Sequence, residues 1–124
     1  MTKGSVEGKR TINRPDIRHG QMIPLWTDLS KGEWPFRPNV FAAIINVHFV
    51  MPALFEFFRY SLRPGGYLLC ETFGGHGENY RELPKAGEWK ASLVSWLSID
   101  MYVEKPAGPD GQSAVSVKLL GRKN

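Results

Sequence analysis

The clearest pattern of apolar and polar positions lies between residues 39 and 73. Residues 40–50 carry no formal charge and are rich in β-branched and aromatic side chains, which is typical of a strand buried on both faces. Apolar residues then recur at helical spacing over residues 54–62, and a Pro-Gly-Gly turn leads into a second apolar run over residues 67–73. The pattern predicts a strand, a helix and a parallel strand joined by a right-handed crossover.

Weaker patterns flank this central unit. Helical spacing of tryptophan and leucine predicts a second helix over residues 88–97. Apolar and polar residues alternate over residues 99–104 and 115–119, on either side of a turn-rich segment, which predicts a terminal antiparallel hairpin. The short apolar run at residues 22–25 is typical of a short strand that leads into a loop. The chain is therefore expected to belong to the α/β class.

The charge is concentrated near the amino terminus. The chain of 124 residues has a formal net charge of +4, and five of its sixteen basic residues lie in the first twenty positions. Such a mildly basic arm lacks the dense Lys/Arg cluster that indicates nucleic-acid binding. Residues 1–20 are expected to form a poorly ordered leader, and residues 21–124 a single domain.

Composition excludes several other classes. The single cysteine, Cys70, rules out an internal disulfide, and its apolar surroundings predict a buried thiol. No apolar run reaches the length of a membrane span, and the first ten residues lack the apolar core of a signal peptide, so a cytoplasmic protein is expected. The scattered histidines at positions 19, 48 and 76 do not have metal-ligand spacing, so no metal site is expected.

The order of these elements resembles the C-terminal half of a class I S-adenosylmethionine-dependent methyltransferase, most closely the small tellurite-resistance-like methyltransferase-domain proteins. Residues 62–69 (LRPGGYLL) are similar to the turn before the family's fifth strand. Residues 71–73 (ETF) are similar to the sequence that follows this segment in many members of the family. Residues 26–29 (WTDL) are similar to the segment after the third strand, and residues 99–120 to strands six and seven. The resemblance implies a partial Rossmann-like sheet with equivalents of strands 3-4-5-7-6.

The chain departs from the family where the cofactor, S-adenosylmethionine, is bound. The family uses a glycine-rich loop after its first strand and an acidic residue at the end of its second, and the roughly twenty residues before Met22 are too few for both. The resemblance therefore implies a methyltransferase-like protein that is incomplete or inactive as an isolated chain, whether a natural half-domain or a truncated product. The alternative is a non-catalytic, dimeric binding or scaffold module derived from the same fold.

The cofactor-side candidates lie after two of the expected strands. By resemblance, Asp28 and Leu29 lie near the adenine of the cofactor, although Asp28 is also suited to capping a turn before Ser30. Asn46 and His48 lie near the end of a strand, where ligands collect in open α/β sheets, and strand alternation places them on one face. The alternative for His48 is a satisfied core or interface group.

The substrate-side candidates lie at the end of the next strand and in the polar loop after it. These are Glu71, Thr72, His76, Asn79 and Tyr80. Methyl transfer depends mainly on orientation and needs a base only when the nucleophile must lose a proton. The spacing of these residues assigns no catalytic base, and the methyl acceptor stays open.

Removing the family's first two strands would leave one sheet edge without a partner. That edge is residues 43–50, which contain no lysine and no proline to protect it from strand addition. We expect the edge to pair, either with itself in a two-fold homodimer that has a continuous sheet or with a separate N-terminal half.

Overall fold

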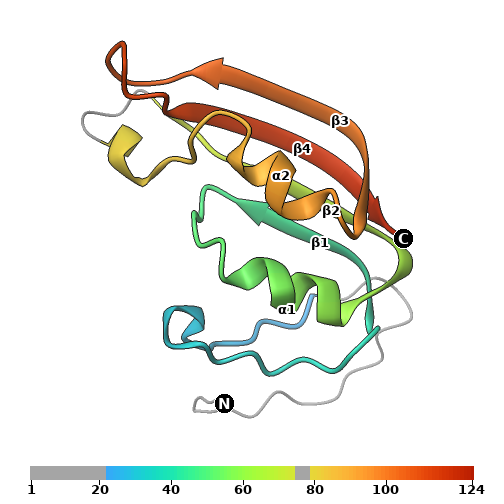
Figure 1. Ribbon diagram of the computed structural model, residues 1–124. Helices are drawn as coiled ribbons and strands as arrows, with labels where there is room; N and C mark the ends of the chain where they lie inside the picture. The colour runs from blue at the N-terminus through green and yellow to red at the C-terminus, as the bar shows by residue number, and fades with distance from the viewer. Residues whose placement is uncertain (1–21, 75–78) are drawn as a thin grey trace. The chain divides into compact units, whose positions relative to one another are not determined.

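The computed structural model describes residues 22–74 and 79–124 (Figure 1). The leader expected over residues 1–20 and the candidate His76 lie outside the described residues. The chain divides into two compact units, one that ends at Phe36 and one that spans Arg37–Asn124.

The described part of the first unit contains one 3-10 helix, η1, over Leu29–Lys31. The strand predicted for residues 22–25 does not form, and residues 22–28 have no regular secondary structure. Pro24 has no N–H group to donate to a sheet ladder, which disfavours a strand in this segment. The expected equivalent of the family's third strand is therefore missing from the described sheet.

The second unit contains a four-stranded mixed sheet with two α-helices (Figure 1). In chain order the elements are β1 (Phe41–Val47), α1 (Leu54–Ser61), β2 (Leu62–Glu71), η2 (Asn79–Glu82), α2 (Glu88–Leu93), β3 (Leu97–Pro106) and β4 (Val115–Lys123). The sheet order is β1-β2-β4-β3, with β1 and β2 parallel and β4 antiparallel to both neighbours. The predicted α/β class, the parallel crossover and the terminal antiparallel hairpin are confirmed.

The Leu-Arg-Pro-Gly-Gly segment differs from its predicted turn, because it begins β2. Phe41 pairs with Leu62, and the next paired residues are Ala43 and Tyr67, so β2 bulges over residues 63–66. A Cβ atom on Gly66 would lie only 2.9 Å from the carbonyl oxygen of Arg63 and 3.1 Å from that of Ala42. Glycine at position 66 therefore allows the bulge to pack against β1.

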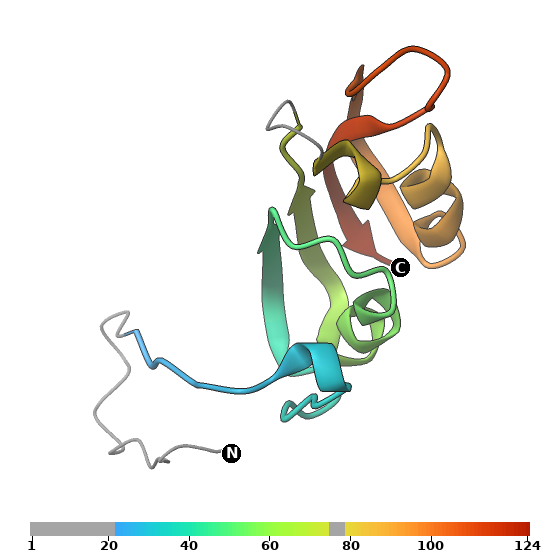
Figure 2. The same cartoon turned by 90° about the vertical axis from the view of Figure 1, so that its left-hand side faces the viewer.

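Both α-helices cover the same face of the sheet (Figure 2). Phe55 of α1 meets Trp89 of α2 edge to face, with ring centroids 5.4 Å apart, and both side chains are buried. The second helix is shorter than predicted and ends at Leu93, because residues 94–96 turn the chain into β3. Among residues 22–74 and 79–124, no helix is long and apolar enough to span a membrane.

No helix of the second unit lies on the opposite face of the sheet (Figure 2). Along β1 the side chains of Ala43, Ile45 and Val47 point to this face and are exposed, and Ile45 is 68% exposed. The sequence predicted a strand buried on both faces, and this prediction is wrong for the described second unit. An uncharged run of apolar side chains suits both a strand buried on two faces and a strand exposed on one face, so composition alone does not distinguish these two environments.

Candidate functional site

The carboxyl ends of the parallel strands β1 and β2 meet at one edge of the sheet. His48 follows β1 directly and has a left-handed backbone, with φ of 59°. Its N–H donates to the carbonyl oxygen of Glu71 at 2.6 Å, and its ring centroid lies 5.3 Å from that of Phe73. The structure therefore brings His48, Glu71 and Phe73 together at the edge where ligands bind in open α/β sheets.

Asn46 lies on the helix-covered side of β1, opposite Cys70 of β2. Its side chain is 9% exposed, and within the described residues its buried Nδ2 has no hydrogen-bond partner. Burial raises the pKa of the Cys70 thiol to about 12, an effect that the neighbouring Asn46 amide partly offsets. Asn46 and His48 were expected on one face, but Asn46 is buried and His48 exposed because β1 ends at Val47.

Glu71 and Thr72 have different environments although they are neighbours. The Thr72 side chain is buried, and its Oγ1 accepts a hydrogen bond from the N–H of Val117 at 2.8 Å. The N–H of Thr72 donates to the carbonyl oxygen of Val117 at 2.9 Å, so Thr72 ties β2 to β4. Glu71 is half-buried on the open face of the sheet, opposite Lys118 of β4. Of the two, only Glu71 offers its side chain to a ligand.

A hollow of about 490 Å³ lies beside Glu71. Its lining combines apolar side chains with two lysines and one carboxylate: Phe73, Met101, Val103, Lys105, Lys118 and Glu71. This volume is within the usual range for small-molecule sites, which are mostly apolar with a few polar groups. The hollow reaches the carboxyl edge through Glu71 and Phe73, and it is the best candidate for a binding site among the described residues.

The loop candidates Asn79 and Tyr80 support the edge of the sheet. The Asn79 Nδ2 donates to the carbonyl oxygen of Phe73 at 2.9 Å. The Tyr80 ring packs so closely on Gly108 that a Cβ atom at Gly108 would lie 2.6 Å from Tyr80 Cγ. These contacts place η2 beside Phe73 and beside the connection between β3 and β4.

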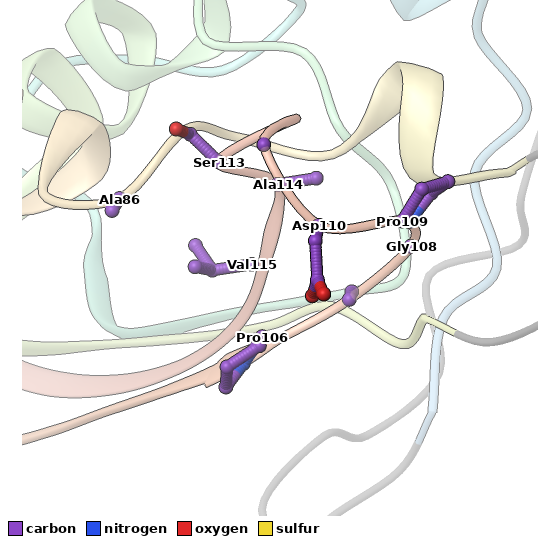
Figure 3. Close-up of a pocket in the computed structure, with 10 residues that line it drawn as sticks. Ala86, Pro106, Gly108, Pro109, Asp110, Ser113, Ala114 and Val115 are labelled. Carbon is purple, nitrogen blue, oxygen red and sulfur yellow. The ribbon is translucent and has the colours of Figure 1, made fainter.

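A second hollow, of about 280 Å³, lies under the connection between β3 and β4 (Figure 3). Figure 3 shows the Asp110 carboxylate projecting from this connection on the side where Val115 and Pro106 lie. Lys85 holds the connection, because its Nζ donates to the carbonyl oxygen of Gln112 at 3.0 Å. Sequence reasoning identified only a turn-rich segment here, and one exposed carboxylate among small side chains is a weaker site than the hollow beside Glu71.

Asp28 lies in the first unit and caps η1. Its Oδ1 accepts hydrogen bonds from the Ser30 N–H at 3.1 Å and from the Ser30 hydroxyl at 2.5 Å. The Ser30 hydroxyl, with a smaller effect from Lys31, lowers the pKa of Asp28 below its usual value. The capping alternative accounts for these contacts, and Leu29 is the first residue of η1. Contact of Asp28 and Leu29 with a cofactor stays a prediction.

No protein-family model matches the chain, and no curated protein sequence matches it. Among solved structures, a geranyl diphosphate methyltransferase in complex with SAM is similar, with a TM-score of 0.54 and 12% identity. A geranyl diphosphate C-methyltransferase from Streptomyces coelicolor A3(2), in complex with Mg²⁺, geranyl diphosphate and S-adenosyl-L-homocysteine, has a TM-score of 0.55 and 13% identity. A SAM-dependent methyltransferase from Methanosarcina mazei has a TM-score of 0.51 and 16% identity.

The similar region covers 74%, 74% and 73% of this chain, and 54%, 51% and 63% of the three solved chains in the same order. The chain therefore spans less than two thirds of the length of these methyltransferases. At these identities the comparison shows a shared fold, and the predicted partial methyltransferase-like sheet is confirmed.

Proposed function

We propose that the chain forms the substrate side of a SAM-dependent methyltransferase-like site and is incomplete for methyl transfer as an isolated chain. The fold shared with three SAM-dependent methyltransferases supports this proposal. The observation that carries it is the hollow beside Glu71 and Phe73, because it opens at the carboxyl edge of the two parallel strands. The similarity of residues 62–69 and 71–73 to tellurite-resistance-like methyltransferases also supports it.

The described residues fit only part of a SAM site. The buried Nδ2 of Asn46 makes no hydrogen bond of ordinary geometry in the described part of the chain, but the amide lies against the Cys70 thiol of β2, and Asn46 lies one strand position before the edge. Within the described sheet, however, no strand precedes β1, so these residues offer neither a glycine-rich loop nor an acidic residue for the ribose. The described residues therefore do not fit the whole cofactor.

The side chains at the edge are suited to orienting a substrate. His48 and Phe73 present two adjacent rings, and Lys118 and Glu71 present opposite charges on the open face. Methyl transfer gains most from fixing the nucleophile in line with the methyl group, and such a mixed surface provides contacts for this purpose. The exposed imidazole of His48 and the half-buried carboxylate of Glu71 are the two groups at this edge that can accept a proton from a nucleophile that must lose one.

Two titrations of the isolated chain test this proposal. In a ¹⁵N NMR titration with millimolar S-adenosyl-L-homocysteine, the amide shifts that change should be confined to residues 46–50 and 71–74. In calorimetry with S-adenosylmethionine, micromolar concentrations of the isolated chain should give no measurable binding heat. Asp110→Asn, in the hairpin hollow, serves as the matched control and should leave the NMR response unchanged, whereas Glu71→Gln should weaken it.

Each titration has an outcome that counts against the proposal. Shift changes centred on Asp110 and the hairpin connection would move the site to the second hollow. Micromolar affinity for S-adenosylmethionine would show that the isolated chain holds a complete cofactor site.

A second candidate function is a non-catalytic dimeric binding module of the same fold. The position of β1 at the end of the sheet, with exposed apolar side chains, favours this candidate. A stable dimer whose amide shifts do not respond to S-adenosyl-L-homocysteine would support the module and contradict the methyltransferase-like site.

A further inference from the structure

We propose that β1 pairs edge to edge and antiparallel with β1 of a second copy of this chain, across a two-fold axis at Ile45. In the sheet order β1-β2-β4-β3, β1 has β2 on one side and no described strand on the other. An unpaired strand edge is a template for strand addition. This pairing does not depend on the proposed methyltransferase-like site.

The directions of the backbone groups identify the free edge. The N–H of Val40 donates to Ser61 and the N–H of His48 donates to Glu71, so both groups point toward β2. Backbone groups alternate sides along a strand, and the extra residues of the bulge belong to β2. The N–H and C=O groups of Ala43, Ile45 and Val47 therefore point away from β2, toward the free edge.

These three residues are self-complementary in one antiparallel register. With Ile45 opposite Ile45 of the second copy, Ala43 of each chain lies opposite Val47 of the other. All three are hydrogen-bonded pairs, so the register forms about six backbone hydrogen bonds and satisfies every outward group of this segment. A two-fold axis requires such self-complementarity.

The side chains of the edge also suit pairing with an identical strand. Ile45 is 68% exposed and Val47 is 46% exposed on the face that no helix of the second unit covers. Apolar cross-strand pairs on one face stabilise antiparallel strands. Residues 40–50 carry no formal charge, so two copies meet without repulsion between like charges.

The oligomeric state of the full chain tests the proposal. Light scattering after size-exclusion chromatography at micromolar concentration should give twice the chain mass of 14.0 kDa. Ile45→Lys places two ammonium groups opposite each other at the axis, and it should raise the dissociation constant of the dimer at least about hundredfold. The matched control is Val94→Lys, which adds the same charge at a 57% exposed position after α2 and should leave the dimer intact.

A cysteine at the axis tests the register. Opposite Cα atoms of a hydrogen-bonded pair lie about 5.5 Å apart, within the range of a disulfide. Ile45→Cys should therefore cross-link under mild oxidation, whereas Val94→Cys should not, and the native Cys70 is buried. Circular dichroism of Ile45→Lys should match that of the wild type, because this side chain and its N–H point away from the core.

Three outcomes would overturn the proposal. The first is a monomer of the wild-type chain at tens of micromolar. The second is a dimer that Ile45→Lys leaves unchanged. The third is a chain that associates only with a separate polypeptide carrying a methyltransferase N-terminal half, which would make that half the occupant of the β1 edge.

Discussion

Lys123 Nζ donates a 2.5 Å hydrogen bond to the carbonyl oxygen of Arg59, joining the last residue of β4 to the last turn of α1. The same ammonium group also donates to the carbonyl oxygen of Leu62 at 2.8 Å. Carbonyl groups at a helix C-terminus have no partners within the helix, and a cation there also opposes the negative end of the helix dipole. Lys123 therefore fastens α1 to the centre of the sheet.

Replacing Lys123 should destabilise the fold. Lys123→Met keeps most of the apolar stem but removes the charged donor, so the free energy of unfolding should fall by about 2 kcal/mol. Urea unfolding followed by circular dichroism measures the change. Lys105→Met, on the exposed part of β3, is the control and should change stability by less than about 0.5 kcal/mol. Equal stability of the two variants would contradict a capping role for Lys123.

Gly66 should tolerate substitution less well than its neighbour Gly65. A Cβ atom at position 66 meets backbone oxygens that cannot move without disturbing the pairing of β1 with β2, so Gly66→Ala should cost about 1–3 kcal/mol. Gly65 has φ of 80° and open space around it, and asparagine tolerates this conformation. In thermal melts, Gly65→Asn should therefore lower the transition temperature less than Gly66→Ala does, and the reverse order would refute the tight packing at position 66.

The central elements were predictable because local patterns encode them. An uncharged apolar run, helical spacing and strict alternation each indicate one type of element, and β1, α1 and the hairpin of β3 and β4 lie where these patterns predicted. The bulge at residues 63–66 was not predictable, because Pro-Gly-Gly suits a free turn as well as a bulged strand. The pairing of Phe41 with Leu62 and the closeness of Gly66 to Ala42 distinguish the two.

The sequence could indicate where candidate site residues lie, but their role stays a prediction. The general rule that ligands bind at the carboxyl ends of parallel strands drew attention to Asn46 and His48, and the family resemblance drew attention to Glu71. The structure brings His48 and Glu71 together, whereas Asn46 is buried. The rule could not reveal that the Thr72 hydroxyl is hydrogen-bonded to the N–H of Val117, which lies 45 positions further along the chain. Contacts between segments far apart in sequence depend on the register of β2 with β4, and no local pattern encodes that register.

The contact between Thr72 and Val117 predicts a structural role for the threonine hydroxyl. Thr72→Val keeps the shape but leaves the buried N–H of Val117 without the acceptor Oγ1, which should cost about 1–3 kcal/mol. Thr72→Ser keeps the hydroxyl and should lose less. Chemical unfolding of both variants measures the difference. A stable Thr72→Val protein with an altered NMR response to S-adenosyl-L-homocysteine would instead support the predicted substrate-side role.

The buried thiol of Cys70 should make the fold sensitive to alkali. Its pKa rises from a usual 9.0 to about 12 in the folded chain, chiefly because burial disfavours the thiolate. Above pH 9 the unfolded chain therefore releases this proton while the folded chain keeps it. The contribution of the thiol to stability is complete below the unfolded pKa and is lost as the pH rises toward the folded pKa.

Other groups also titrate in alkali, among them Tyr102, because burial and the neighbouring Glu104 raise the pKa of its hydroxyl. Comparison of the wild type with Cys70→Ala isolates the contribution of the thiol from the contributions of these groups. The stability of the wild type relative to Cys70→Ala should fall by about 2–3 kcal/mol between about pH 8 and about pH 11, since each unit of pKa shift corresponds to about 1.4 kcal/mol. Urea unfolding at both pH values gives this difference directly. A difference that stays constant with pH would show that Cys70 reaches solvent in the folded chain, and the thiol should then also react with iodoacetamide before unfolding.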